Sequence, residues 1–417
     1  MMDERTETTP VFDPRDAASA ARFFEKCTAA ARKGSRFSVQ VLESPFADPS
    51  LSGLTGGTAD PDEAARLISD PGAEGDDPVL PVSHSGFSKI EEVSKLDMLL
   101  EAGGGVLLRD AVAAASDLGL FFPHSDILLP EDITLAGLLM DGPVTPFSGA
   151  FGPLREYILS IELVTPAGAR IHSGSRAIKD VAGYEIIGYM IGRGARCGMI
   201  SSVTLRLLPE PPSRLKVAAG GKAESVASLP QALEEKYRLV SAEIFAGRPA
   251  EIVSKLIETD GAKSPDNGAL LLAELHSPVK GTEERMLSDM RASAPDLIIE
   301  PVKEPFGAVE RDTIRELAGE YGALSLLSFD GDEAPGGPRA VASWKSVYPL
   351  RRSLLIERGS GSIYESRDHA DPASRARLYD VESRSGRLIG RRRHVYEDVP
   401  IEERIDRVFD PEGIMER

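Results

Sequence analysis

The sequence is poor in cysteine and contains no long apolar run. Two cysteines among 417 residues, Cys27 and Cys197, give neither a disulfide framework nor the ligand spacing of a metal site. No apolar run reaches the ~18 residues that a membrane-spanning helix requires, so we expect no direct membrane insertion. The acidic first residues lack the apolar segment of a secretory signal, and we therefore expect a cytoplasmic protein.

Basic residues are fewer than acidic residues. The chain has 48 lysines and arginines against 66 aspartates and glutamates, a formal net charge of −18 at pH 7. A charge of this sign repels phosphate backbones and anionic lipid surfaces, which argues against nucleic acid or membrane partners. The hydrophobic fraction of 41% and charged fraction of 27% are typical of a globular protein. A chain of this length suffices for two domains and a tail.

Apolar periodicity and turn residues predict an alternation of helices and strands. Asp13 and Pro14 are expected to be the N-cap and first position of a helix that stops at Gly34. A second helix is expected to end at Gly119. Strands are expected at 36–42, 79–82, 88–93, 96–102, 157–164 and 169–173. The prolines at 209–212 then interrupt the pattern, and we expect a domain boundary there.

Beyond residue 212, helices and strands alternate again. Helices are predicted at 228–239, 250–261 and 281–292, and strands at 213–220, 240–247, 268–277 and 297–302. This alternation fits an α+β layer of the ferredoxin-like kind, and residues 351–366 are compatible with a hairpin. The expected division is therefore 1–212, 213–345 and 346–417, the last with a basic stretch and a terminal helix.

Glycines are concentrated shortly before residue 200. Gly183, Gly192, Gly194 and Gly198 are spaced too irregularly for a flexible linker. Glycine is tolerated where the backbone takes a positive φ or lets another group approach closely. The strand that follows, 199–208, alternates apolar and polar residues with the period of a half-buried sheet edge. We therefore expect this segment to line a bound ligand.

Residues 179–209 resemble the FAD-binding domain of the vanillyl-alcohol oxidase and p-cresol methylhydroxylase superfamily, in particular its glycolate oxidase and D-lactate dehydrogenase branch. The branch pattern is K-N-V-A-G-Y-D, then G-S-E-G-T-L-G-V-I-T and a strand that ends L-x-P. Upstream, residues 152–174 resemble the family's Y-G-x-x-R-D-x-V-L-G-x-E-V-V-x-x-D-G, and the likeness extends over 86–212. It implies an α+β fold: a two-subdomain FAD-binding domain of the p-cresol methylhydroxylase type over 1–212, then a ferredoxin-like α+β cap over 213–345.

The resemblance also implies which residues bind FAD. They are Gly53, Gly56, Gly57, Thr58, Thr134, Gly137, Gly152, Arg155, Lys179, Gly183, Tyr184, Gly192, Gly198 and Ile200. The sequence departs from the family at two places. The pyrophosphate loop P-x-G-G-G-T-S is replaced by a segment with an acidic run, which would repel phosphate unless it faces solvent. In the T-I-G-G-N segment, Leu138 stands where the family has a polar residue. Two alternatives stay open: the altered loop still holds the pyrophosphate, or it no longer does.

The sequence contains no recognisable catalytic group. Relatives in the D-lactate branch share a cap motif, H-G-D-G-N-x-H, that supplies metal ligands and a base, and this chain has no such run. His276, a lone histidine at the end of a predicted strand, is expected to be solvated. We therefore predict no catalytic residue and no metal ligand.

The resemblance then implies an accessory subunit. The chain would be the FAD-binding subunit of a 2-hydroxy-acid oxidising complex of the glycolate or lactate type, an oxidoreductase subunit for CH–OH donors. It would relay electrons from a catalytic flavoprotein subunit, beside an iron–sulfur subunit. One alternative is a structural subunit that keeps the fold without the cofactor. The other is an autonomous oxidase with unfamiliar catalytic groups.

Several conspicuous residues have a plainer interpretation. Cys27 and Cys197 are expected to be small buried hydrophobes, although the family places position 197 beside the flavin. His84 is not expected to anchor a flavin covalently. A basic cluster is either a solvated loop or a docking patch for an acidic partner subunit. That cluster consists of Arg387, Arg391, Arg392, Arg393 and His394.

Overall fold

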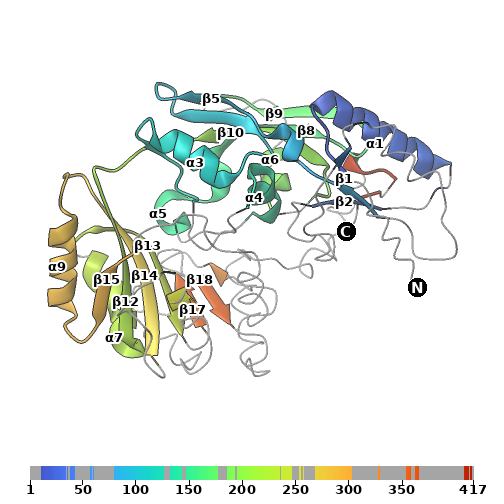
Figure 1. The fold of residues 1–417 in the computed structure, drawn as a ribbon. Coiled ribbons are helices and arrows are strands. Elements are labelled where there is room, and N and C mark those ends of the chain that lie inside the picture. The colour runs from blue at the N-terminus through green and yellow to red at the C-terminus, as the bar shows by residue number, and fades with distance from the viewer. Residues whose placement is uncertain are drawn as a thin grey trace, which may run out of the picture.

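The structure of the protein is a computed structural model. It describes residues 11–33, 35, 38–42, 57–58, 60, 79–125, 132–142, 147–176, 186–192, 195–234, 236–246, 253–254, 257, 268–302, 327–328, 354–357, 362–365, 408–412 and 414–415. Two bodies lie side by side in Figure 1, the first built on two sheets and the second on one. No helix in this described part combines the length and apolar character needed to span a membrane.

The first sheet is small and parallel. Its strands are β1 (Val11–Phe12), β2 (Ser38–Val41), β3 (Gly57–Thr58) and β4 (Val79–Val82), in the order β2-β4-β1-β3. Helix α1 (Ala17–Arg32) packs beside it and buries Phe23, Phe24 and Cys27. The predicted strands at 36–42 and 79–82 are confirmed as β2 and β4.

The start of α1 differs from the sequence prediction. The N-cap is Asp16, whose carboxylate accepts from Ser19 N at 2.6 Å while the Ser19 hydroxyl accepts from Asp16 N at 3.2 Å. This reciprocal capping box satisfies two donors at once. Asp13 was the wrong choice, because its carboxylate accepts from Gly86 N at 2.6 Å and ties the chain start to the 3₁₀ helix η2 (Ser85–Phe87).

The second sheet is antiparallel and contributes many residues to the hydrophobic core of the first body. Its order is β5-β6-β10-β8-β9, with β5 (Ile90–Ser94), β6 (Leu99–Gly103), β8 (Ile158–Val164), β9 (Arg170–Gly174) and β10 (Met199–Arg206). The sequence predicted β10 as a half-buried edge, but it is the central strand. Thr204 is buried and accepts a hydrogen bond from the Ser160 hydroxyl at 2.8 Å, so a polar residue is tolerated there.

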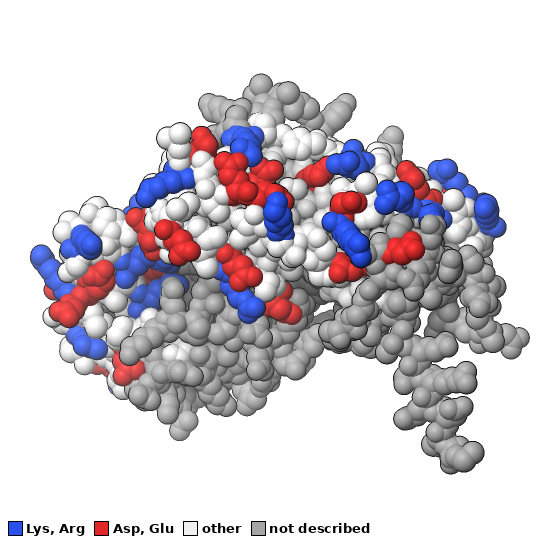
Figure 2. All heavy atoms as spheres, turned by 45° about the horizontal axis from the view of Figure 1, so that its top comes forward, with Lys and Arg blue, Asp and Glu red and all other residues white. Residues whose placement is uncertain are grey.

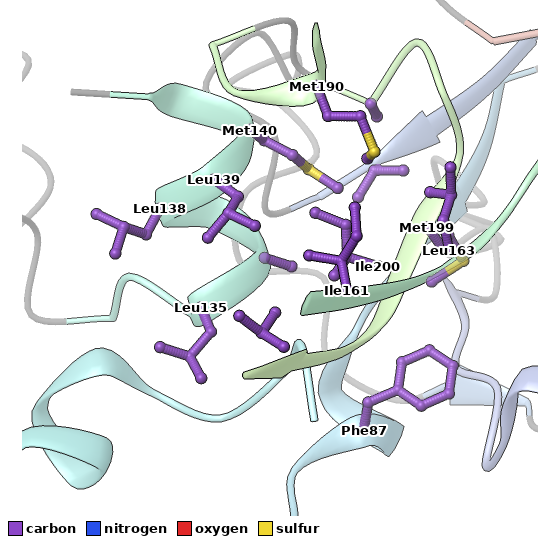
Figure 3. Close-up of a cluster of buried hydrophobic side chains, with 14 of the residues drawn as sticks. Phe87, Leu135, Leu138, Leu139, Met140, Ile161, Leu163, Met190, Met199 and Ile200 are labelled. Atoms are coloured by element: carbon purple, nitrogen blue, oxygen red, sulfur yellow. The ribbon is translucent and has the colours of Figure 1, made fainter. Parts of the chain in front are cut away.

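Short elements close the first body. They are α3 (Leu108–Ser116), β7 (Leu120–Phe121), α4 (Leu135–Asp141), α5 (Ser148–Phe151), η3 (Leu154–Tyr157), α6 (Ile186–Met190) and β11 (Leu208–Pro209), which pairs with β7. Figure 3 shows how α4 presents Leu139 and Met140 toward Ile161 and Ile200 of the second sheet. One continuous hydrophobic cluster therefore joins both sheets of this body.

The second body has the expected ferredoxin-like arrangement. It contains β12 (Ser213–Lys222), α7 (Ala223–Glu234), β13 (Arg238–Ala246), β14 (Gly268–Ser277), α9 (Glu283–Ser293) and β15 (Ile298–Pro301). The four strands are antiparallel in the order β15-β12-β14-β13, and both helices share one buried cluster with the sheet. The sheet continues through β17 (Leu354–Glu357) and β18 (Ser362–Glu365), the hairpin that 351–366 allowed, to β16 (Leu327–Ser328).

The last described residues return to the first body. Val39 N donates to Ile414 O at 2.7 Å, and Met415 forms a bridge to the same strand. The Asp410 carboxylate accepts from the backbone N–H groups of Ile414 and Met415, which fixes the turn. The basic cluster 387–394 lies outside the described residues.

Charged side chains of both signs are interspersed on the face shown in Figure 2. Ion pairs such as Arg176–Glu92 at 2.8 Å and Lys89–Glu91 at 2.5 Å account for part of this mixture. Because the described residues of this face mix both signs, the excess of acidic residues does not form one large patch on it.

Candidate cofactor and substrate site

The structure describes only part of the predicted FAD-binding set. Gly53, Gly56, Lys179, Gly183 and Tyr184 lie outside the described residues.

The remaining predicted residues fall into three places. Gly57 and Thr58 form β3 at the edge of the first sheet. Gly152 follows α5 and Arg155 is in η3. The other five lie where α4 packs on β10 and on the segment after α6: Thr134 and Gly137 at the start of α4, Gly192 bonded to Leu139, Ile200 on β10, and Gly198 just before β10 against Val164 of β8.

The N-terminus of α4 satisfies its own backbone donors. Gly137 N donates to the Thr134 hydroxyl at 3.0 Å. Leu135 N donates to Val106 O at 2.9 Å and Ala136 N to Gly104 O at 2.7 Å. A helix N-terminus binds phosphate through N–H groups that have no partner in the helix. The first turn of α4 therefore has no unpaired backbone N–H group for a phosphate. Any contact of this turn with a cofactor would involve atoms other than these N–H groups.

Glycines near α4 allow backbone to pack on backbone. A Cβ atom on Gly142, which has φ +56°, would lie 2.5 Å from Gly192 N, and Gly192 N itself donates to Leu139 O at 2.9 Å. On Gly198, with φ +116°, a Cβ atom would lie 2.0 Å from Val164 O. The sequence predicted a close approach at Gly192 and Gly198 but not at Gly142. In the structure the group that approaches is protein backbone.

Ile200 and His84 are joined inside the core. Ile200 N donates to His84 Nε2 at 3.1 Å, and the His84 side chain is fully buried. The histidine thus holds β10 against the segment that follows β4. Cys27 and Cys197 are 0% and 1% exposed, which confirms them as small buried hydrophobes, and burial raises the pKa of the Cys27 thiol.

Aromatic rings of the first body contact cations of the second. The Arg214 guanidinium lies 5.6 Å from the Phe121 ring centre, and that of Arg238 lies 5.4 Å from the Phe151 ring centre. The His276 ring lies 5.8 Å from Phe121 and 6.0 Å from Phe151. Since Phe121 is on β7 and Phe151 on α5, these contacts join the two bodies through one face of the cap sheet.

Glu274 and His276 form a buried pair on β14 that the sequence prediction missed. Glu274 is 1% exposed and His276 5% exposed, and Glu274 Oε1 lies 2.6 Å from His276 Nε2. The same oxygen accepts from Arg214 Nε at 2.9 Å, and Lys216 Nζ lies 3.5 Å from Oε2. The expectation of a solvated histidine was wrong, because β14 extends to Ser277 and carries His276 into the contact between the bodies.

The charges around Glu274 set its ionisation. Burial by itself would raise the pKa of Glu274, but the hydrogen bond with His276 and the charges of Lys216 and Arg214 outweigh it and lower the pKa to about 2. The sequence did contain a signal for this cluster. Glu-x-His in one strand and Arg-x-Lys in another place all four side chains on one sheet face once the strands pair.

Residues 68–174 match a family model described as an FAD binding domain. The chain contains an FAD-binding domain of the p-cresol methylhydroxylase type. The chain has the fold of alkyldihydroxyacetonephosphate synthase, with a TM-score of 0.54 and 12% identity over 97% of this chain and 75% of that one.

Two curated relatives are similar in sequence. D-lactate dehydrogenase of Anaerostipes hadrus is 27% identical over 237 residues, which are 52% of this chain and 46% of that protein. Glycolate oxidase subunit GlcE of Escherichia coli is 27% identical over 124 residues, 29% of this chain and 35% of that subunit. The matched residues thus span less than half of the length of each relative.

The described residues give FAD partial support. The segments that contain Gly142 and Gly192 meet where a Cβ atom would be excluded, but this close contact joins protein backbone to protein backbone, so the packing of the chain itself accounts for both glycines. Cations and aromatic rings line the contact between the bodies, a combination suited to a planar, anionic cofactor. No metal-binding group of three or more His, Cys, Asp or Glu side chains occurs in the part that the structure describes.

Proposed function

We propose that the chain is the FAD-binding subunit of a 2-hydroxy-acid oxidising complex of the glycolate or lactate type. The observation that carries the proposal is the similarity to GlcE, 27% over 124 residues, in a chain with an FAD-binding domain. The missing H-G-D-G-N-x-H motif supports an accessory role. In this role the subunit relays electrons from a catalytic flavoprotein subunit, beside an iron–sulfur subunit, and the cytoplasm is the proposed location.

FAD supplies the two-electron acceptor in this proposal. The chain's residues bind and orient it: residues 1–212 hold the cofactor, 213–345 cover it, and 346–417 complete the chain. Lys179 is proposed to face its anionic end, and Gly152 and Arg155 to lie near it. Of the predicted pyrophosphate loop, Gly57 and Thr58 form β3, whereas Gly53 and Gly56 lie outside the described residues. The pyrophosphate contact is proposed to involve this whole segment.

Flavin binding is the first test. The purified chain should show the absorption bands of oxidised flavin, and added FAD should raise its melting temperature with concentration. Binding only to the folded state adds about 2.7 kcal/mol at a hundredfold excess over Kd. Lys179→Ala should weaken FAD about tenfold through loss of a charge-assisted contact. Lys280→Ala, an exposed lysine of the cap, is the matched control and should bind like wild type.

A structural subunit without cofactor is the second candidate. The internal hydrogen bonds of the α4 N-terminus and the complete burial of Leu138 favour it. A colourless chain whose melting temperature stays constant in saturating FAD would support this candidate and contradict the first.

A further inference from the structure

Among the described strands, the cap sheet ends on one side at the short strand β15, which lies next to helix α9 (Figure 1). An edge strand presents its outward N–H and C=O groups to any extended chain that approaches, including the same strand of a second copy. This edge is accessible, because Ile298 is 52% exposed and Pro301 is also exposed. The outward backbone groups of β15 therefore decide whether the cap sheet can pair with another sheet.

The pairing of β15 with β12 determines which of its backbone groups face outward. Val302 N donates to Lys216 O at 2.9 Å, and β15 runs antiparallel to β12 in the same register. Along an antiparallel strand, residues that exchange hydrogen bonds with the neighbour alternate with residues whose backbone groups point away from it. Pro301 and Ile299 lie one and three positions before Val302, so their backbone groups point outward.

Both outward residues are partly closed to a further strand. Arg291, in the last turn of α9, donates to Ile299 O from Nε at 3.0 Å and from Nη2 at 2.8 Å. Two donors of one guanidinium thus occupy the outward carbonyl of Ile299. Pro301 has no N–H group, so it offers no outward donor. Of the outward groups, one acceptor is therefore occupied and one donor is missing.

A second copy of this chain is the partner that fits the edge. Two β15 strands related by a two-fold axis at Ile299 would run antiparallel, with each Ile299 N–H donating to the Ile299 carbonyl of the other copy. This pairing needs the same carbonyl that Arg291 occupies, so the guanidinium would have to leave first. The exposed Ile298 side chain would add apolar contact between the copies.

We propose that Arg291 is a guard residue that prevents β15 from pairing with the β15 strand of a second copy. This role goes beyond the proposed function, since no step of it requires FAD. The plainer alternative is that Arg291 only fastens the end of α9 to β15. A fastening affects the stability of the cap alone, whereas a guard also affects self-association.

Arg291→Ala tests the proposal by sedimentation velocity of the full chain over a range of concentrations. The self-association constant should rise about tenfold over that of the wild type, the effect of one to two backbone hydrogen bonds gained between copies. Arg285→Ala is the matched control, because it removes the same charge from an exposed position of α9, and it should associate like the wild type. Equal association of Arg291→Ala and the wild type, with an unchanged circular dichroism spectrum, would overturn the proposal.

Hydrogen exchange locates the contact between the copies. In Arg291→Ala, the backbone amides of residues 297–302 should become more protected as the protein concentration rises. Protection that appears in another part of the chain instead would contradict pairing through β15.

A second substitution in the same variant should reverse the effect. Ile298→Glu places a carboxylate opposite Glu300 of the second copy, and like charges directly opposite one another destabilise a strand pair. The association of Arg291→Ala with Ile298→Glu should therefore return to the wild-type level, and unchanged association would refute the pairing. If Arg291→Ala does not fold, Arg291→Lys replaces it, because lysine keeps the charge but lacks the planar pair of donors. Arg291→Lys should associate more strongly than the wild type, and equal association would again overturn the proposal.

Discussion

His124 shows how one buried residue governs the response of this fold to acid. Its side chain is 0% exposed and lies against Tyr157 at 5.0 Å and Phe122 at 5.9 Å between ring centres. Burial lowers the pKa of His124 from 6.5 to about 3. The ring is therefore neutral in the folded protein, whereas the unfolded chain takes up a proton as the pH falls below 6.5.

The free energy of unfolding should consequently decrease as the pH is lowered from 6.5 to 4.5. One proton taken up on unfolding gives a slope that approaches about 1.4 kcal/mol per pH unit. His124→Phe should flatten the curve in this window, as measured by urea denaturation at half-unit steps of pH. Glu274, with its pKa lowered from 4.5 to about 2, adds its own loss of stability only below that window.

An exposed histidine provides the control for this experiment. His172→Phe changes a solvated side chain on β9 and should leave the slope unchanged. If His124→Phe keeps the full slope of the wild type, a group other than His124 causes the acid sensitivity.

At the scale of elements, the sequence predicted those helices and strands that depend on a local pattern of residues. Most strands and helices and the ferredoxin-like order followed from periodicity and turn residues. The cap of α1 did not, because Asp13 and Asp16 both suit an N-cap and only Asp16 has Ser19 three residues on. The helix predicted at 228–239 was misplaced by five residues, since α7 spans Ala223–Glu234 and β13 begins at Arg238. The central place of β10 depends on pairing with β6 and β8, which are distant in sequence.

The candidate site, too, could be predicted only where it depends on local sequence. The FAD-binding fold could be inferred from the resemblance of residues 86–212 to a known family, but the Glu274–His276 pair could not. The environment of this pair forms only when β12 pairs with β14 and the two bodies come into contact. Both contacts join residues that are distant in sequence, so no short segment predicts them. The internal use of the α4 donors was equally hidden, since Val106 and Gly104 come from another element.

The contact between α4 and the segment after α6 allows a sharp test. Gly142→Ala adds a Cβ atom at φ +56°, 2.5 Å from Gly192 N. We expect a loss of about 2–4 kcal/mol in the free energy of unfolding, from backbone strain and displacement of a packed segment. Urea denaturation measures this loss.

Gly281→Ala separates the two causes. Gly281 has φ +74° but nothing within 4 Å of an added Cβ atom, so only the strain of about 1 kcal/mol should appear. Equal losses in both variants would mean that the Gly142–Gly192 contact contributes nothing beyond backbone conformation.

At the scale of the whole molecule, contacts between rings and cations join the described residues of the cap to those of the first body. Arg238 on β13 lies 5.4 Å from the ring centre of Phe151 on α5. If this contact couples the two bodies, the combined effect of Arg238→Ala and Phe151→Leu should be smaller than the sum of the single effects. The expected coupling is about 0.5–1 kcal/mol in the free energy of unfolding, because the arginine is exposed and its charge is partly screened.

A surface ion pair within the first body is the reference for this double-mutant cycle. Lys89 and Glu91 are 76% and 49% exposed, and their coupling should be close to zero because solvent screens exposed pairs. A coupling for Arg238 and Phe151 no larger than for Lys89 and Glu91 would show that the two bodies do not stabilise each other there. The same cycle at Arg214 and Phe121, whose guanidinium and ring centre lie 5.6 Å apart, would then measure the coupling at the second of these contacts between the bodies.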